Sequence, residues 1–125
     1  MFIEVLKGKI HRATVTEADL DYIGSLTLDK DLMESAGLQE YEKIQVLDLT
    51  NGNRIETYII NGERGSGQVC INGAAAHLIH KGDLVIIVSY CQIKQKNILS
   101  HKPDIVHVDS NNNIIYTSKE IHTIK

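Results

Sequence analysis

The sequence predicts a mainly β protein, built as a small closed barrel with short helices in one domain over residues 1–125. Its core must come mostly from Ile, Val and Leu, because aromatic residues make up only 5% of the chain and Trp is absent. The β-branched members of that set favour strands. Seven or eight short strand-like segments follow one another, separated by Gly and Asn turns. Closing strands this short into a barrel removes their exposed edges.

Two strands are expected at the N-terminus, over residues 2–6 and 9–15, with Gly8 as a break between them. Side-chain alternation places three residues on one face of the second strand: Lys9, His11 and Ala13. Residues 16–19 are expected to form a single capped turn. Residues 20–28 then run extended, past a Gly-Ser pair.

Two short helices are expected. Asp29 is a favourable N-cap for the first, over residues 30–36, and Gly37 follows where a left-handed residue ends a helix. The second covers residues 72–78, where Asn72 caps the helix and the alanines that follow propagate it.

The remaining strands are expected over residues 43–49, 54–60, 68–71, 84–91, 104–108 and 114–117. Asn51-Gly52 is the strongest hairpin signal in the chain and joins the first two of them. Residues 111–113, all Asn, join the last two in another hairpin. The segment 84–91 is the most apolar, which predicts burial on both faces.

Composition disfavours several classes of function and location. The net charge is −3 and the basic residues are scattered, so no nucleic-acid partner is expected. The longest apolar run, residues 84–88, is too short to span a membrane, and the N-terminus does not resemble a signal peptide. Cys70 and Cys91 have no metal spacing and are predicted to be reduced, buried, inert thiols of a cytoplasmic protein. His77 and His80 lack a third ligand, so no metal site is expected.

The Gly24-Ser25 pair carries the candidate chemistry. Gly24 has no Cβ atom, so its backbone can take a strained conformation and its carbonyl can be approached from either side. The Ser25 hydroxyl can lie beside the carbon of the preceding peptide bond, where a donor on the Gly24 carbonyl would let it attack its own backbone. A Gly-Ser pair alone is typical of an ordinary turn. The prediction therefore depends on partner residues elsewhere in the chain.

Three such partners lie in the strand after the first hairpin. Arg54 offers a planar fork that matches a carboxylate, Tyr58 a phenol that can give a proton to a carbanion, and Thr57 a short hydroxyl donor. Strict alternation puts Arg54 and Tyr58 on one face and Thr57 on the other. For all three to meet at one site, the strand must bulge, end, or lie between two subunits. A half-exposed strand with its charges facing water fits the same residues.

Backbone donors and two further polar residues complete the candidate set. A helix that opens at Asn72 would point its first N–H groups, over residues 73–75, at a carboxylate, and the small side chains there allow close approach. A plain helix cap explains the same segment. Lys9 and His11 share a strand face, which ordinary surface alternation explains equally well.

Taken in order, the motifs resemble one family, the pyruvoyl-dependent aspartate 1-decarboxylases, bacterial enzymes that make β-alanine for pantothenate. The matching segments are 9–12 (KIHR), 22–25 (YIGS), 50–52 (TNG), Arg54 with 57–58 (TY), 63–66 (ERGS), 72–77 (NGAAAH) and 82–83 (GD). The resemblance runs from about residue 8 to residue 88, and the tail beyond about residue 92 carries none of the signature.

The resemblance implies a six-stranded double-psi β-barrel that assembles as a homotetramer, with active sites between neighbouring subunits. It also implies an inactive precursor that cuts itself into residues 1–24 and 25–125, which leaves a covalent pyruvoyl group derived from Ser25. Thr57 and Asn72 would hold the oxyanion. The residues implied in processing are Gly24, Ser25, Thr57 and Asn72. A maturation factor is a further partner that this chemistry allows for.

The implied activity converts L-aspartate to β-alanine and CO₂ for pantothenate and coenzyme A, through a Schiff base to the pyruvoyl ketone. That ketone is the electron sink, so neither pyridoxal phosphate nor a metal is expected. Catalysis falls to Ser25, as the pyruvoyl precursor, and to Tyr58, which resembles the proton donor. The residues implied in substrate binding are Lys9, His11, Arg54, Thr57, Gly73, Ala74 and Ala75.

A non-catalytic double-psi barrel that serves as a binding module is the alternative function. Such a module would keep the strands but has no use for Gly24-Ser25, Thr57 and Tyr58 together. The tail is given no function, and its histidines are expected to be plain surface residues: His101, His107 and His122.

Overall fold

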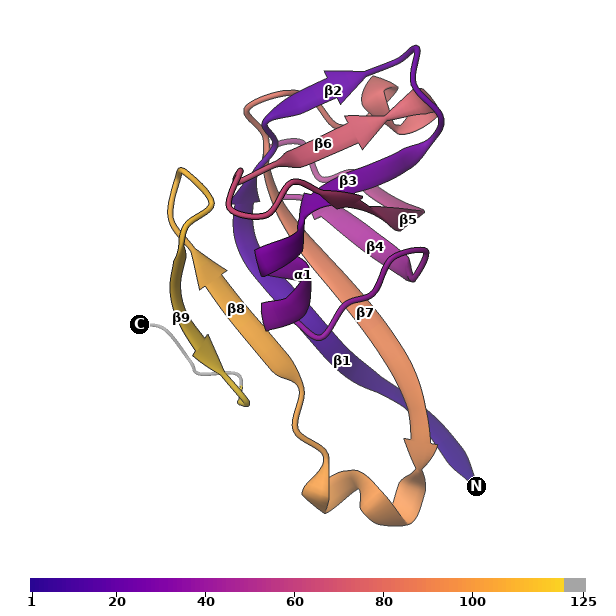
Figure 1. Ribbon diagram of the computed structural model, residues 1–125. Coiled ribbons are helices and arrows are strands. Elements are labelled where there is room, and N and C mark those ends of the chain that lie inside the picture. Colours follow the sequence, from indigo (N-terminus) through magenta and orange to yellow (C-terminus); the bar gives the residue numbers. More distant parts are fainter. Residues whose placement is uncertain (121–125) are drawn as a thin grey trace.

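The structure, a computed structural model, describes residues 1–120 and is mainly β (Figure 1). Its strands are β1 (Phe2–Thr14), β2 (Glu17–Asp19), β3 (Ser25–Asp29), β4 (Lys43–Asp48), β5 (Arg54–Gly62), β6 (Val69–Asn72), β7 (Leu84–Lys94), β8 (Asp104–Val108) and β9 (Ile114–Ser118). Its helices are α1 (Lys30–Ser35) and two 3₁₀ helices, η1 (Gly73–His77) and η2 (Gln95–Ser100). The predicted mainly β class is confirmed.

The strands form one sheet in the order β2-β6-β3-β5-β4-β7-β1-β8-β9. β2 follows β1 after two residues, Val15 and Thr16. The Val15 N–H donates to the Asp83 carbonyl (2.9 Å), just before β7, and the Thr16 N–H donates to the Val69 carbonyl (2.8 Å) on β6. β1 and β2 do not pair with each other, so the ladder itself is not closed. The chain nevertheless bends the sheet round, and β1 with β2, β6, β3, β5, β4 and β7 surround one core (Figure 1).

The core consists of inward-facing aliphatic side chains from every strand of that ring. Ile10, Leu26, Ile59 and Ile87 are all fully buried. Burying a side chain of this size contributes roughly 1.5–3 kcal/mol. α1 closes one side of the core with Leu32, and it packs against β3 and β8 (Figure 1).

The predicted break at Gly8 is wrong, because β1 continues through it. Gly8 marks a register shift in the pairing with β7 instead. A Cβ atom there would lie 2.1 Å from the Ala36 carbonyl oxygen, so the glycine lets the end of α1 approach the strand. This contact with Ala36 explains why residue 8 is a glycine, and the neighbouring sequence does not reveal it.

A second register shift in β1 lies between Ile10 and Ala13, where Arg12 has a φ of 65°. The predicted common face holds for Lys9 and His11, which alternate with the buried Ile10. It is wrong for Ala13, because the extra residue turns Ala13 into the core, where it is fully buried.

The capped turn predicted for residues 16–19 is also wrong. Glu17–Asp19 forms β2, which pairs in parallel with β6 and places Asp19 opposite Asn72. Only the second part of the extended segment predicted for residues 20–28 is a strand, because residues 20–24 form a loop before β3. Residues 17–19 form a strand because they pair with β6, which lies some fifty residues further along the chain.

Both predicted hairpins are confirmed, β4 with β5 and β8 with β9, as is the first helix. The second predicted helix is a five-residue 3₁₀ helix, η1, and the Asn72 side chain does not cap it. β7 is longer than predicted, and burial on both faces holds only in part, since Ile86 is half-buried and Tyr90 exposed. η2 was not predicted. No helix within residues 1–120 has the length and apolar character needed to cross a membrane.

The tail is part of the sheet, because β8 pairs in parallel with β1. The prediction that the histidines of the tail are plain surface residues is wrong for two of them. The His101 Nε2 atom lies 2.6 Å from the Leu6 carbonyl oxygen, and the half-buried His107 ring stacks on Tyr116 with centroids 4.3 Å apart. His122 lies outside the described residues.

Asn112 fastens the tail to the barrel. Its side-chain oxygen accepts a hydrogen bond from the Thr14 N–H (2.8 Å), and its side-chain nitrogen donates to the carbonyls of Thr14 (2.9 Å) and Gly67 (2.8 Å). The side chain thus occupies the place of a strand residue beside the end of β1. Asn112 is buried and has a φ of 62°, a conformation that asparagine tolerates better than most residues.

Candidate active site

Ser25 opens β3 at a point where β3 lies between β6 and β5. It pairs with Asn72, the last residue of β6, in the antiparallel ladder. Both side chains are almost fully buried, at 1% and 2% exposure. Two residues that lie 47 positions apart in the sequence therefore meet in a region closed to bulk water.

The Asn72 amide connects the polar groups of this region. Its nitrogen donates to the Ser25 hydroxyl at 3.0 Å and to the Thr27 hydroxyl at 2.9 Å. Its oxygen accepts from the Cys70 thiol at 3.2 Å. The Ser25 hydroxyl in turn donates to the Ile23 carbonyl at 3.2 Å. The candidate nucleophile is therefore held by one donor and one acceptor at the start of its strand.

Gly24 precedes Ser25 in an exposed position and is not among the glycines with positive φ, so it does not use the left-handed conformation that glycine permits. The positive φ belongs to Gly73, at 71°. A Cβ atom on Gly73 would lie 2.9 Å from the Gly24 nitrogen and 3.1 Å from the Tyr22 carbonyl oxygen. Gly73 thus brings a second backbone directly against the bond that was predicted to break.

Tyr58 lies beside Ser25. Leu26 pairs with Ile59 in the parallel ladder of β3 and β5, so the preceding residues, Ser25 and Tyr58, are neighbours on the same face. The structure therefore brings three predicted site residues together, Ser25, Tyr58 and Asn72, from three adjacent strands.

Thr57 faces the other side of β5, as alternation predicts. It pairs with the buried Ile44, and β5 pairs with β3 and β4 without any register shift. β5 also continues to Gly62. A bulge or strand end is therefore excluded as the way to bring Thr57 and Tyr58 to one site within this chain, and the third arrangement, a site between subunits, is taken up below.

Arg54 and Lys9 are not brought to Ser25 within the chain. Arg54 is exposed at the start of β5, where its Nη1 donates to the Gln45 side-chain oxygen at 3.3 Å. Lys9 lies opposite Val88 on β1, and β1 is separated from β3 in the sheet by β5, β4 and β7. Both side chains alternate with core residues and so lie on the outer face.

His11 lies near Lys9 on β1 and beside the tail. Its ring centroid is 5.2 Å from that of His107, its partner residue on β8. Burial lowers the pKa of His11, and the charges of Lys9, His107 and Arg12 lower it further. The His11 Nδ1 atom is buried without a hydrogen bond. The neutral imidazole is therefore the favoured form at neutral pH.

Ala74 and Ala75 follow Gly73 in η1, with Ala74 exposed and Ala75 half-buried against the core. They lie next to Asn72 and so close to Ser25 in the fold. The segment predicted to offer backbone donors thus adjoins the candidate nucleophile, although it forms a 3₁₀ turn instead of an α-helix.

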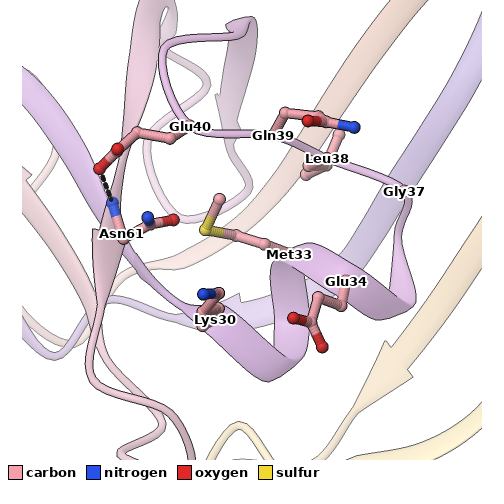
Figure 2. Close-up of a pocket in the computed structure, with 8 residues that line it drawn as sticks. All are labelled: Lys30, Met33, Glu34, Gly37, Leu38, Gln39, Glu40 and Asn61. Carbon is pink, nitrogen blue, oxygen red and sulfur yellow. Dashed lines mark hydrogen bonds between the residues drawn. The ribbon is translucent and has the colours of Figure 1, made fainter.

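A hollow of about 430 Å³ lies beside α1, and none of the predicted site residues lines it. Figure 2 shows the residues around it. Its lining residues are Lys30, Met33, Glu34, Gly37, Leu38, Gln39, Glu40 and Asn61. The Asn61 N–H donates to the Glu40 carboxylate at 3.0 Å across it (Figure 2). The polar side chains that line this hollow are exposed or half-buried. Within residues 1–120 no cluster of three or more His, Cys, Asp or Glu side chains could hold a metal ion.

Sequence reasoning missed Thr27 and Cys70 as members of the site. The alternation of polar and apolar residues could have found them, since Ser25 and Thr27 flank a core leucine on β3 and Cys70 and Asn72 flank a core isoleucine on β6. The predicted burial of the thiols is confirmed for Cys70 and wrong for Cys91, which is half-buried on β7.

The family profile described as aspartate decarboxylase matches residues 1–115 of this chain. The chain belongs to the aspartate decarboxylase family. This confirms the family that the motifs resemble, and it extends the match through the tail to β9.

Individual relatives agree with the assignment to the aspartate decarboxylase family. The chain is 58% identical to an aspartate 1-decarboxylase of Caldicellulosiruptor saccharolyticus, over 98% of this chain and 97% of the relative. It is 59% identical to one of Corynebacterium efficiens, over 92% and 85% of the two chains. One of Neisseria meningitidis is 54% identical over 99% of each.

The comparison with solved structures gives a weaker similarity. The computationally designed protein msDPBB_sym2 matches with a TM-score of 0.42 and 16% identity, over 68% of this chain and 96% of that one.

Proposed function

We propose that this chain converts L-aspartate to β-alanine and CO₂ for pantothenate biosynthesis in the cytoplasm, with a pyruvoyl group made from its own Ser25. The family match and the name shared by the relatives support the reaction. The structural observation that best supports the proposal is the hydrogen-bonded pair of Ser25 and Asn72, which fixes a buried serine hydroxyl next to a glycine. A non-catalytic binding module would have no use for that arrangement.

The proposed processing begins when the Ser25 oxygen attacks the Gly24 carbonyl carbon. The bond from that carbon to the Ser25 nitrogen breaks, the nitrogen takes up the proton, and an ester joins Gly24 to the side chain. Loss of the Ser25 α-proton then expels the Gly24 carboxylate and leaves dehydroalanine, which water converts to a pyruvoyl group and ammonia. Because the buried Ser25 hydroxyl is held directly after Gly24, the first attack is intramolecular and needs no second reactant to be brought in.

Asn72 acts on the nucleophile in the uncut chain. Its amide nitrogen lies against the Ser25 hydroxyl, and a small rotation of Ser25 would pass that donor to the oxyanion formed on Gly24. A fixed donor of this kind contributes about 3–4 kcal/mol to such a step. Thr57 would also hold the oxyanion, but from a neighbouring subunit, because it faces away from Ser25 in its own chain.

The pyruvoyl group would supply an electron sink for the loss of CO₂. The residues at this position fit it, because the Ser25 side chain is buried and its neighbour Tyr58 shares its face. Tyr58 would deliver the proton that replaces CO₂. Arg54 and Lys9 would bind substrate carboxylates and His11 would support them, while the backbone of residues 73–75 would add neutral donors.

The proposal includes a homotetramer whose sites lie between subunits. Lys9 lies on β1, which β5, β4 and β7 separate from β3 in the sheet, so one chain does not bring Lys9 to its own Ser25. A second copy can supply the missing groups. A maturation factor remains part of the proposal only if the purified chain does not cut itself.

The mass of the denatured chain tests the proposal. We expect two fragments, residues 1–24 and 25–125, in protein that releases β-alanine from L-aspartate. Ser25→Ala should stay whole at 14.0 kDa and lose the activity. Ser66→Ala is the matched control, since it alters the other Gly-Ser pair, where the exposed Ser66 donates to the Glu63 carbonyl in a turn. Uncut protein with full activity would overturn the proposal.

A further inference from the structure

Four polar side chains form a compact group on one face of β3 and β6. Ser25 pairs with Asn72, and Thr27 pairs with Cys70. The residues that alternate with them, including Leu26 and Ile71, belong to the core. Polar groups in so buried a position are expected to be fully hydrogen-bonded, and here they are bonded to one another.

The Asn72 amide has two possible orientations, which differ by a half-turn about its last bond. As the structure has it, the nitrogen faces the hydroxyls of Ser25 and Thr27, and the oxygen faces the thiol of Cys70. The amide is held in this orientation by two bonds, one that its oxygen accepts from the Cys70 thiol and one that its nitrogen donates to the Thr27 hydroxyl.

Cys70 is suited to remain a donor. Burial raises the pKa of its thiol, and the negative charges of Glu17 and Asp19 on the neighbouring β2 raise it further. The proton consequently stays on sulfur at neutral pH. A thiolate in the same place would repel the Asn72 oxygen and remove the preference.

The orientation of the amide matters for Ser25. With the nitrogen toward it, the Ser25 oxygen accepts from Asn72 and directs its own proton to the Ile23 carbonyl. With the amide reversed, the Asn72 oxygen would compete for the Ser25 proton and no donor would remain for an oxyanion on Gly24. Only the observed orientation combines a fixed nucleophile with a nearby donor.

We propose that Cys70 and Thr27 are positioning residues for the cleavage of the Gly24–Ser25 bond, because together they hold the Asn72 amide with its nitrogen toward Ser25. This inference rests on the proposed function and concerns how the pyruvoyl group is made, not how it is used. Neither residue touches the reacting carbonyl in this role.

The test measures how fast freshly purified, uncut 14.0 kDa chain turns into its two fragments, by mass under denaturing conditions. Cys70→Ala and Thr27→Val each remove one hydrogen bond to Asn72, so each should slow cleavage about tenfold. Cys70→Ser and Thr27→Ser keep the donor or acceptor and should cleave at close to the parent rate.

Cys91→Ala is the matched control, because it removes the chain's other thiol from β7, away from this group, and should not change the rate. Midpoints of unfolding are recorded for every variant. If Cys70 only fills space, the cleavage rate should follow the midpoint, and the smaller, more polar serine should not rescue it. The positioning role instead predicts rescue by serine at whatever midpoint that variant has.

Two results would overturn the inference alone: Cys70→Ala cleaving as fast as a parent that does cleave, or Cys70→Ser being as slow as Cys70→Ala. A parent chain that makes β-alanine while still uncut would overturn the proposed function and this inference together. The two kinds of failure are thus distinguished by the parent's own mass.

Discussion

A Cβ atom on Gly73 would lie 2.7 Å from the α-carbon of Gly24, so two backbone segments from distant parts of the sequence pack with no side chain between them. The approach fixes where residues 20–24 run before β3. It also places the first residue of η1 against the bond that the proposed chemistry breaks.

Gly73→Ala should therefore lower both stability and cleavage. The added methyl group meets backbone atoms that cannot move aside, and the φ of 71° adds strain, so we expect a loss of about 2–4 kcal/mol in the free energy of unfolding. Gly52→Ala is the control, because its φ of 82° carries similar strain with nothing within 4 Å. Urea unfolding measures both, and equal losses would show that steric contact with Gly24 contributes nothing.

Arg54→Lys should reduce activity far more than stability. Lysine keeps the charge but not the planar pair of donors that fits a carboxylate, so we expect kcat/KM for L-aspartate to fall at least tenfold, or about 1.4 kcal/mol. Stability should hardly change, because Arg54 is exposed and makes one long hydrogen bond to Gln45. Arg64→Lys, at an exposed arginine paired with Asp31 and Glu34, is the control and should keep full activity. Equal kinetics in the Arg54 variant and the parent would contradict a carboxylate-binding role.

Asn112→Ala should destabilise the chain by about 2–4 kcal/mol, because the buried Asn112 side chain makes three hydrogen bonds to half-buried backbone groups of Thr14 and Gly67, and all three are lost. The neighbouring variant Asn111→Ala should change little, since Asn111 is exposed. Chemical unfolding compares the two. A similar small effect in both would mean that the tail is not fastened at this point.

Asp48→Asn should change how stability depends on pH. Burial raises the pKa of the Asp48 carboxyl, and the adjacent Asp83 raises it further. The folded chain therefore holds this proton more tightly than the unfolded chain, so its contribution to stability is full at acid pH and is lost as the pH rises through the raised pKa. Asparagine mimics the protonated form, and we expect a gain of about 1 kcal/mol near pH 8 with little change near pH 4.

Asp109→Asn is the control of opposite sign for this experiment. Hydrogen bonds from the backbone of Asn113 and Asn111 lower the pKa of Asp109, so its carboxylate stabilises the fold above its unfolded pKa. That variant should lose stability near pH 8 and match the parent at acid pH. Urea unfolding between pH 4 and pH 8 gives both profiles, and a loss near pH 8 in Asp48→Asn would contradict the expected sign.

Local signals in the sequence predicted what local physics decides. Asn51-Gly52 located one hairpin, and Asp29 located α1, where its side chain accepts a hydrogen bond from the Asp31 N–H. β2 was missed because its partner on β6 is far along the chain, and propensity alone favours a turn there. Gly8 was misread for the same reason, since its role lies in a contact with Ala36.

The site divides in the same way. The Gly24-Ser25 pair was recognisable from its chemistry, but nothing in the spacing places Asn72 beside Ser25, and that expectation came from the resemblance to a family. Cys70 was set aside as inert because a thiol carries no sign of its neighbour. Its hydrogen bond to Asn72 exists only once β3 and β6 pair.

The position of β1 in the sheet limits how this protein can be produced. β1 lies between β7 and β8, and β2 pairs along β6, so residues 1–24 form an internal part of the fold and not a detachable leader. A gene for residues 25–125 alone would encode a polypeptide that lacks β1, the longest strand described in the sheet. In the proposed function, self-cutting is therefore a step that follows folding, and recombinant expression could not skip it by starting at the second fragment.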